Sequence, residues 1–108
     1  MAKLVKSING NFNDILSRVE NGVLNGSMSA SLEDQWDVRE GNARCSVRVF
    51  ERYSYMGSNR VSMNVTLFQE GTGPVRLCAI TSGGSQAMFF KVNTIGEESF
   101  LDTLKDIL

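Results

Sequence analysis

The alternation of apolar and polar residues through the middle of the chain constrains its fold more than any other feature. Between Ser27 and Val38 apolar side chains occupy most even positions, with Ser, Glu, Gln and Asp between them. The alternation returns in residues 43–55, 61–67 and 75–82, and short glycine-containing turns separate these stretches. Because successive side chains of a strand point to opposite faces, the pattern predicts an antiparallel meander with one buried face.

A glycine pair, Gly83-Gly84, follows the last of these stretches. A two-residue hairpin turn there pairs residues 75–82 with residues 85–92, and every inward apolar residue then meets another. A phosphate loop would need the glycines to open a helix and a Lys-Ser/Thr pair to follow, and a nucleophile elbow would need a histidine partner. No Lys-Ser/Thr pair follows these glycines and the chain has no histidine, so we interpret the glycines as a turn.

Two segments show helical spacing. After a short apolar strand at residues 3–8, Asn11 can cap a helix whose apolar residues are Phe12, Ile15, Leu16, Val19 and Val23. Residues 95–108 form a second amphipathic segment, preceded by a capping box of Thr94 and Glu97. The expected order is β-α-β-β-β-β-β-α, a two-layer α+β fold in which an N-terminal and a C-terminal helix pack against the antiparallel meander.

Length and composition indicate one domain over residues 1–108. The chain is 42% hydrophobic and 21% charged, which is ordinary for a soluble globular protein, and it has no repeat or linker. A net charge of -1 provides no general attraction to nucleic acid or to an anionic membrane. Neither a signal peptide nor a run of about 20 apolar residues is present, so we expect a cytoplasmic protein without membrane contact.

The residues that carry common catalytic chemistry are missing or far apart. Cys45 and Cys78 have no metal-ligand spacing and are assigned to opposite faces of the sheet. Asp34 and Glu51 break the inward apolar pattern, but the predicted register separates them by on the order of 14 Å, which is too far to share a proton. We therefore expect no catalytic residues, no metal, no cofactor and no enzymatic activity.

The predicted register places a basic row interleaved with aromatic residues on the outer face of the sheet. Exposed phenylalanines are costly in water, so this face favours a partner, and a second copy forming a homodimer is preferred to nucleic acid because acids share the face. The alternative, that the arginines only cover the strands and pair with acids, stays open. The candidate binding face comprises Arg48, Phe50, Phe68, Arg76, Phe89 and Lys91.

A second set of residues falls on the predicted inward face and could line a pocket beneath the helices. It supports an alternative function, a small START-like carrier of an apolar or amphipathic ligand. The candidate pocket residues are Asp34, Trp36, Glu51, Tyr53 and Met63.

The ending SGGSQAMFFKVNTIGEESFLDTL, with the acid-rich first strand and arginine-rich second strand of the meander, resembles a family of small uncharacterised bacterial proteins, a domain of unknown function. The resemblance covers essentially the full chain and implies no mechanism. In fold alone the predicted order is similar to TATA-binding-protein-like and START-like folds, which implies no function. The function we expect is that of a non-enzymatic cytoplasmic binding or assembly protein that self-associates through a sheet face.

Overall fold

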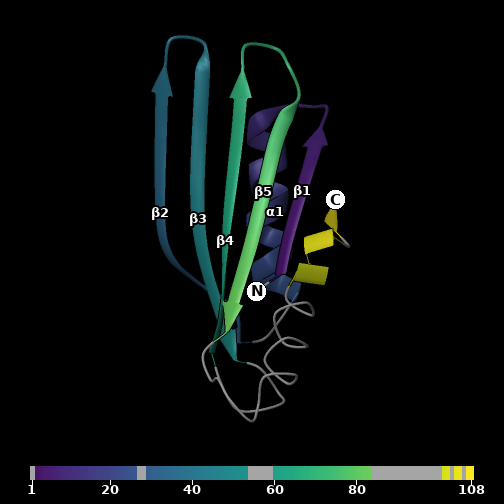
Figure 1. Cartoon of the computed structure of the whole chain (residues 1–108), viewed down its shortest axis with the longest axis vertical. Coiled ribbons are helices and arrows are strands. Elements are labelled where there is room, and N and C mark those ends of the chain that lie inside the picture. Colours follow the sequence, from purple (N-terminus) through teal and green to yellow (C-terminus); the bar gives the residue numbers. More distant parts are fainter. Residues whose placement is uncertain (1, 27–28, 54–59, 84–100, 103, 106) are drawn as a thin grey trace.

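The computed structural model describes residues 2–26, 29–53, 60–83, 101–102, 104–105 and 107–108 (Figure 1). Its elements are β1 (Ala2–Ile8), α1 (Phe12–Gly26), β2 (Ser31–Glu40), β3 (Ala43–Tyr53), β4 (Arg60–Glu70) and β5 (Val75–Gly83). The five strands form one antiparallel sheet in the order β1-β5-β4-β3-β2. The chain therefore ends its meander beside its first strand, and β1 and β2 are the two edges.

The expected fold class was wrong in its elements. The described residues form five strands and one helix, in the order β-α-β-β-β-β, where six strands and two helices were predicted. Gly83 continues β5 opposite Val61, so the strand includes the first residue of the predicted hairpin turn. The predicted strand at 85–92 and most of the predicted helix at 95–108 lie outside the described residues. Five of the residues described after residue 100 are helical, but they do not form a continuous second helix among the described residues; Leu101 and Leu104 are buried as predicted.

Helix α1 forms where the sequence predicted it. The side-chain oxygen of Asn11 accepts a hydrogen bond from the backbone N–H of Asp14 at 3.0 Å, which caps the first turn. The apolar residues at helical spacing are the ones that α1 buries: Phe12, Ile15, Val19 and Val23. No helix in the described part of the chain has both the length and the apolarity that a membrane crossing requires.

One face of the sheet packs against α1, which runs behind β1, β5 and β4 in Figure 1. β4 and β5 present their odd-numbered residues to the helix, and cross-strand pairing of Phe68 with Arg76 is confirmed. The buried residues of these two strands are Val61, Met63, Val65, Leu67, Val75, Leu77, Ala79 and Thr81. This part of the core follows the alternation in the sequence.

β3, and β2 from Asp34 onward, face the opposite way from the prediction. A register shift between Leu32 and Asp34 leaves Leu32 packed against the core, as predicted. In β3 the residues buried against the helix are Ser46, Arg48 and Phe50, and the apolar alternates Val47 and Val49 are turned to the other face. The register explains the inversion, because Phe68 pairs with Cys45 rather than with Arg48. An offset of three residues is odd, so it exchanges the two faces of a strand relative to its neighbour.

Replacing Gly22 by alanine should destabilise the fold, although alanine is the better helix former by about 1 kcal/mol. A Cβ at residue 22 would lie less than 3.0 Å from three side-chain atoms of Ile107. Because both branches of the Ile107 side chain are involved, rotating one of them does not relieve the clash. Overpacking of this kind costs about 1 to 3 kcal/mol. The prediction is checked by urea unfolding of Gly22→Ala.

The same substitution in an Ile107→Ala background gives the control, because the obstructing side chain is then gone. There Gly22→Ala should raise the free energy of unfolding, so the sign of its effect should reverse. A stabilising effect in both backgrounds would contradict the packing of Ile107 on α1.

Candidate functional site

The face of the sheet opposite α1 carries an exposed apolar surface, which we call the open face. Among the described residues, all the exposed large hydrophobic side chains belong to it: Val5, Trp36, Tyr53, Phe68 and Ile80. Trp36 is 60% exposed and Val5 is 67% exposed. Neither side chain is therefore part of the core that α1 covers.

The strand register joins these residues into a continuous band. One row crosses all five strands through Val5, Cys78, Thr66, Val47 and Trp36. The row beside it contains Phe68, between Arg76 and Cys45. Cross-strand neighbours of this kind lie about 4.5 to 5.5 Å apart, so the apolar side chains form one surface.

Charges on the open face are divided between its two sides. Lys3 and Arg76 lie on the side of β1 and β5, whereas Asp34 and Glu40 lie on β2. Near one end of the face, Arg60 forms an ion pair with Glu51 at 2.6 Å. The apolar band thus has a basic side and an acidic side.

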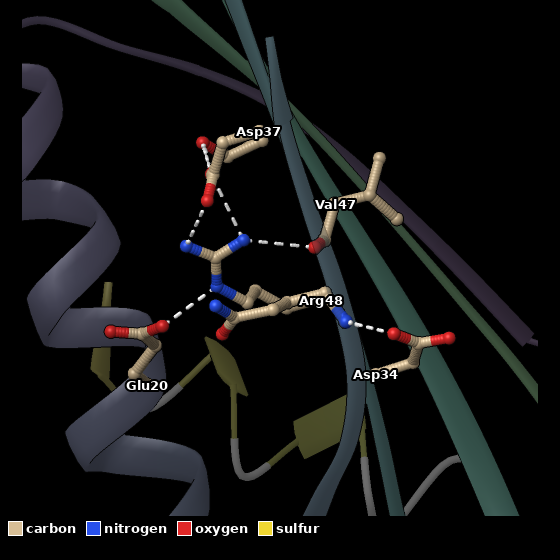
Figure 2. A network of polar contacts seen from close by, with 7 residues as sticks. Glu20, Asp34, Asp37, Val47 and Arg48 are labelled. Atoms are coloured by element: carbon tan, nitrogen blue, oxygen red, sulfur yellow. Dashed lines mark hydrogen bonds and ion pairs between the residues drawn. The ribbon is translucent and has the colours of Figure 1, made fainter.

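The other face holds a buried polar cluster where α1 meets the sheet. Figure 2 shows the guanidinium of Arg48 between Glu20 of α1 and Asp37 of β2. Its Nε donates a hydrogen bond to Glu20 at 2.7 Å, and its two terminal nitrogens contact Asp37 at 3.0 and 3.3 Å. Ser46 also donates a hydrogen bond to Asp37. The side chain of Arg48 is only 6% exposed, and this cluster fixes α1 to β3 and β2.

The pKa values in this cluster follow from its hydrogen bonds. Burial works against the charged form of Arg48, but the bonds to Glu20 and then Asp37 outweigh it and raise the pKa of Arg48. The hydrogen bond from Ser46, followed by that from Arg48, lowers the pKa of Asp37. Arg48 and Asp37 therefore stay charged at neutral pH.

The structure separates the residues of the candidate binding face. Phe68 and Arg76 are neighbours on the open face, whereas Arg48 and Phe50 are buried on the α1 side. Phe89 and Lys91 lie outside the described residues. The candidate pocket is divided as well, because Met63 lies in the core while its other four members are on the open face: Asp34, Trp36, Glu51 and Tyr53.

Two further features differ from the sequence interpretation. Cys45 and Cys78 are free cysteines on the same face, not on opposite faces, since Cys45 pairs with Phe68 and Cys78 with Thr66. In the described ranges, no three His, Cys, Asp or Glu residues are grouped to hold a metal ion. The sequence interpretation did not identify Glu20 as the partner of Arg48. Its position directly after Val19, at the border of the predicted apolar stripe, is the signal that could have indicated a partly buried acid.

Comparison with known proteins gives a family but no activity. Residues 1–108 match the family model of DUF6054, a family of unknown function. The chain belongs to the DUF6054 family. No curated protein and no solved structure matches the chain. The surface of this DUF6054 protein is therefore the guide to what it binds.

Proposed function

We propose that this protein is an assembly module that self-associates by stacking its open face on the open face of a second copy. The supporting observation is the apolar band that crosses all five strands on the face opposite α1. Bands of this kind on an otherwise polar surface are typical of interaction sites. The proposal retains the non-enzymatic, cytoplasmic character expected from the sequence.

The two sides of the open face favour a second copy as the occupant. A two-fold axis along β4 would place the β1 side of one copy over the β2 side of the other. Val5 would then face Trp36 of the second copy, and Lys3 would face Asp34. Phe68 would meet its own counterpart near the axis, so these apolar residues meet apolar residues and Lys3 meets an acid.

The size of the face also suits a dimer. Five strands about 4.8 Å apart, with a rise of about 3.3 Å per residue, give a surface of roughly 700 Å² per copy. A stable protein interface buries about 800 Å² per partner, and sheets pack face to face about 10 Å apart. The open face is thus large enough without other elements.

Native mass spectrometry and the fluorescence of Trp36 test this proposal together. Trp36 is the chain's sole tryptophan and is exposed in the monomer, so its emission reports on the open face directly. We expect a dimer mass at micromolar concentration and a shift of the emission to shorter wavelength as the protein is concentrated. The midpoint of that shift should match the dissociation measured by mass.

A monomer mass up to about 100 µM, with unchanged emission, would contradict self-association. A dimer whose Trp36 emission stays that of an exposed indole would place the interface elsewhere. Both results would reject the open face as the surface for a second copy.

A further inference from the structure

Three chain connections meet at one end of the sheet, shown at the top of Figure 1. They are the turn between β2 and β3, the turn between β4 and β5, and the connection from β1 into α1. The backbone N–H of Gly71 donates to the carbonyl of Asn42 at 2.8 Å, which joins the two turns. Gly41 and Gly71 both have a φ of 59°, a conformation that glycine adopts without strain.

Two adjoining grooves of about 360 and 310 Å³ lie at this end. They share Arg44, Gln69, Gly71 and Thr72, and the first also includes Arg39. Among the described residues, neither groove is lined by an aspartate or a glutamate. The grooves therefore form a concave region whose charged side chains are arginines.

The two arginines are placed against each other without a counter-charge. Arg39 and Arg44 are direct partners across β2 and β3, and like charges in that position repel. Neither forms an ion pair with a described residue. The carboxylate that acts on Arg44, that of Asp37, is already held by Arg48 and Ser46.

Arg44 has no ion-pair partner among the described residues, and its side chain is held in place by Phe12. Its guanidinium lies over the ring of Phe12, 3.9 Å from the centroid. Stacking on an aromatic ring leaves the edge of the guanidinium, with its N–H donors, free for an anion that presents two oxygens. Burial, and then the charge of Arg39, lower the pKa of Arg44.

We propose that Arg39 and Arg44 bind the phosphate group of a small molecule in this groove. Phosphate oxygens match the fork of a guanidinium and accept two parallel hydrogen bonds. Thr72 lines both grooves, and the second is also lined by Phe12 and Asn13, the first residues of α1, whose backbone N–H groups have no partner within the helix. An anion here would relieve the repulsion between the arginines. The site lies at the end of the sheet, apart from the centre of the open face.

The test measures binding of three probes to the full chain in a phosphate-free buffer: inorganic phosphate, pyrophosphate and a short-chain phosphatidic acid below its micelle concentration. Thermal unfolding and ³¹P line widths are followed in wild type, Arg39→Gln, Arg44→Gln and Arg44→Lys. Arg18→Gln is the matched control, since Arg18 is an exposed arginine on α1. We expect saturable stabilisation of wild type and the control, and at least tenfold weaker binding for each Gln variant.

The outcomes separate the sources of the phosphate. Saturation by inorganic phosphate or pyrophosphate supports a soluble ligand, and saturation by phosphatidic acid alone supports a lipid headgroup. Arg44→Lys should also bind more weakly, because lysine keeps the charge but loses the fork. No saturable binding of any probe, or equal binding by Arg39→Gln and wild type, would overturn the proposal. Arg39 is exposed, so its variant keeps the fold and decides the matter even if Arg44→Gln unfolds.

Discussion

Replacing both Glu20 and Asp37 by alanine is expected to destabilise the protein by about 3 to 5 kcal/mol, whereas Arg48→Met should cost about 1 kcal/mol or less. The difference arises because the members of the cluster are unequally buried. The Arg48 side chain is 6% exposed, while those of Glu20 and Asp37 are 28% and 50% exposed. Removing the acids leaves a buried cation whose remaining hydrogen bond is to the carbonyl of Val47, with no carboxylate to neutralise it. Removing the arginine leaves two carboxylates that water can reach.

Urea unfolding followed by circular dichroism measures both effects. The matched control is Glu40→Ala with Glu70→Ala, which removes the same two charges from exposed positions. The control should change the free energy of unfolding by less than about 1 kcal/mol. Equal losses for the two double variants, or a larger loss for Arg48→Met, would contradict the cluster as the attachment of α1 to the sheet.

The same cluster predicts a dependence on acid. Because the pKa of Asp37 is lowered in the folded state, its contribution to stability is present above the unfolded value of about 4. That contribution is lost as the pH falls through the folded pKa. Wild type should therefore lose more stability below about pH 4 than the variant without Glu20 and Asp37.

The cluster also explains why the sequence predicts some strands correctly and inverts others. α1, β4 and β5 bury their apolar alternates, so periodicity identifies both the elements and their inward faces. β3 buries Ser46, Arg48 and Phe50 instead. Arg48 and Ser46 can be buried because Glu20 and Asp37 supply their ion-pair and hydrogen-bond partners. A binary pattern of apolar and polar residues carries no information about a partner 28 residues away.

The inverted faces of β2 and β3 determine which residues of the open face could be predicted from the sequence. Phe68 and Arg76 were assigned to the outer face correctly, because the β4 and β5 pairing follows from a short turn. Trp36 was assigned to the inward face as a pocket residue, and the apolar alternates of β3, Val47 among them, were assigned to the same face, because both follow the apolar alternation of their strands. The apolar residues that the core does not use are the ones that form the band on the open face.

Phe68→Glu is expected to leave the fold intact and to weaken the proposed dimer by about 100-fold or more. Phe68 is 41% exposed, so the change removes little from the core. Near the two-fold axis each dimer would lose two phenylalanine contacts and bring two carboxylates together. At about 1 kcal/mol for each half-exposed ring, with repulsion added, the loss approaches 3 kcal/mol.

Native mass spectrometry and sedimentation at matched concentrations measure the weakening. Ser17→Glu is the control, since it adds the same charge at an exposed position of α1, on the opposite side of the sheet. It should dissociate at the wild-type concentration, and Phe68→Leu should also remain dimeric. A Phe68→Glu protein that is folded and still dimeric would exclude the open face as the interface.

The arrangement within the dimer can be tested independently of its existence. With the axis along β4, Val5 of one copy faces Trp36 of the other, so Val5→Glu and Trp36→Lys should each weaken the dimer. In the double variant a glutamate of one copy would face a lysine of the other, so part of the lost dimer affinity should be recovered. Substitutions at two sites that do not touch would show no such recovery. Strictly additive effects would retain the open face as the interface but require a different axis. Val5 and Trp36 lie on the two edge strands of one sheet, so they can interact only across the interface. The coupling between their substitutions therefore reports directly on how two copies face each other.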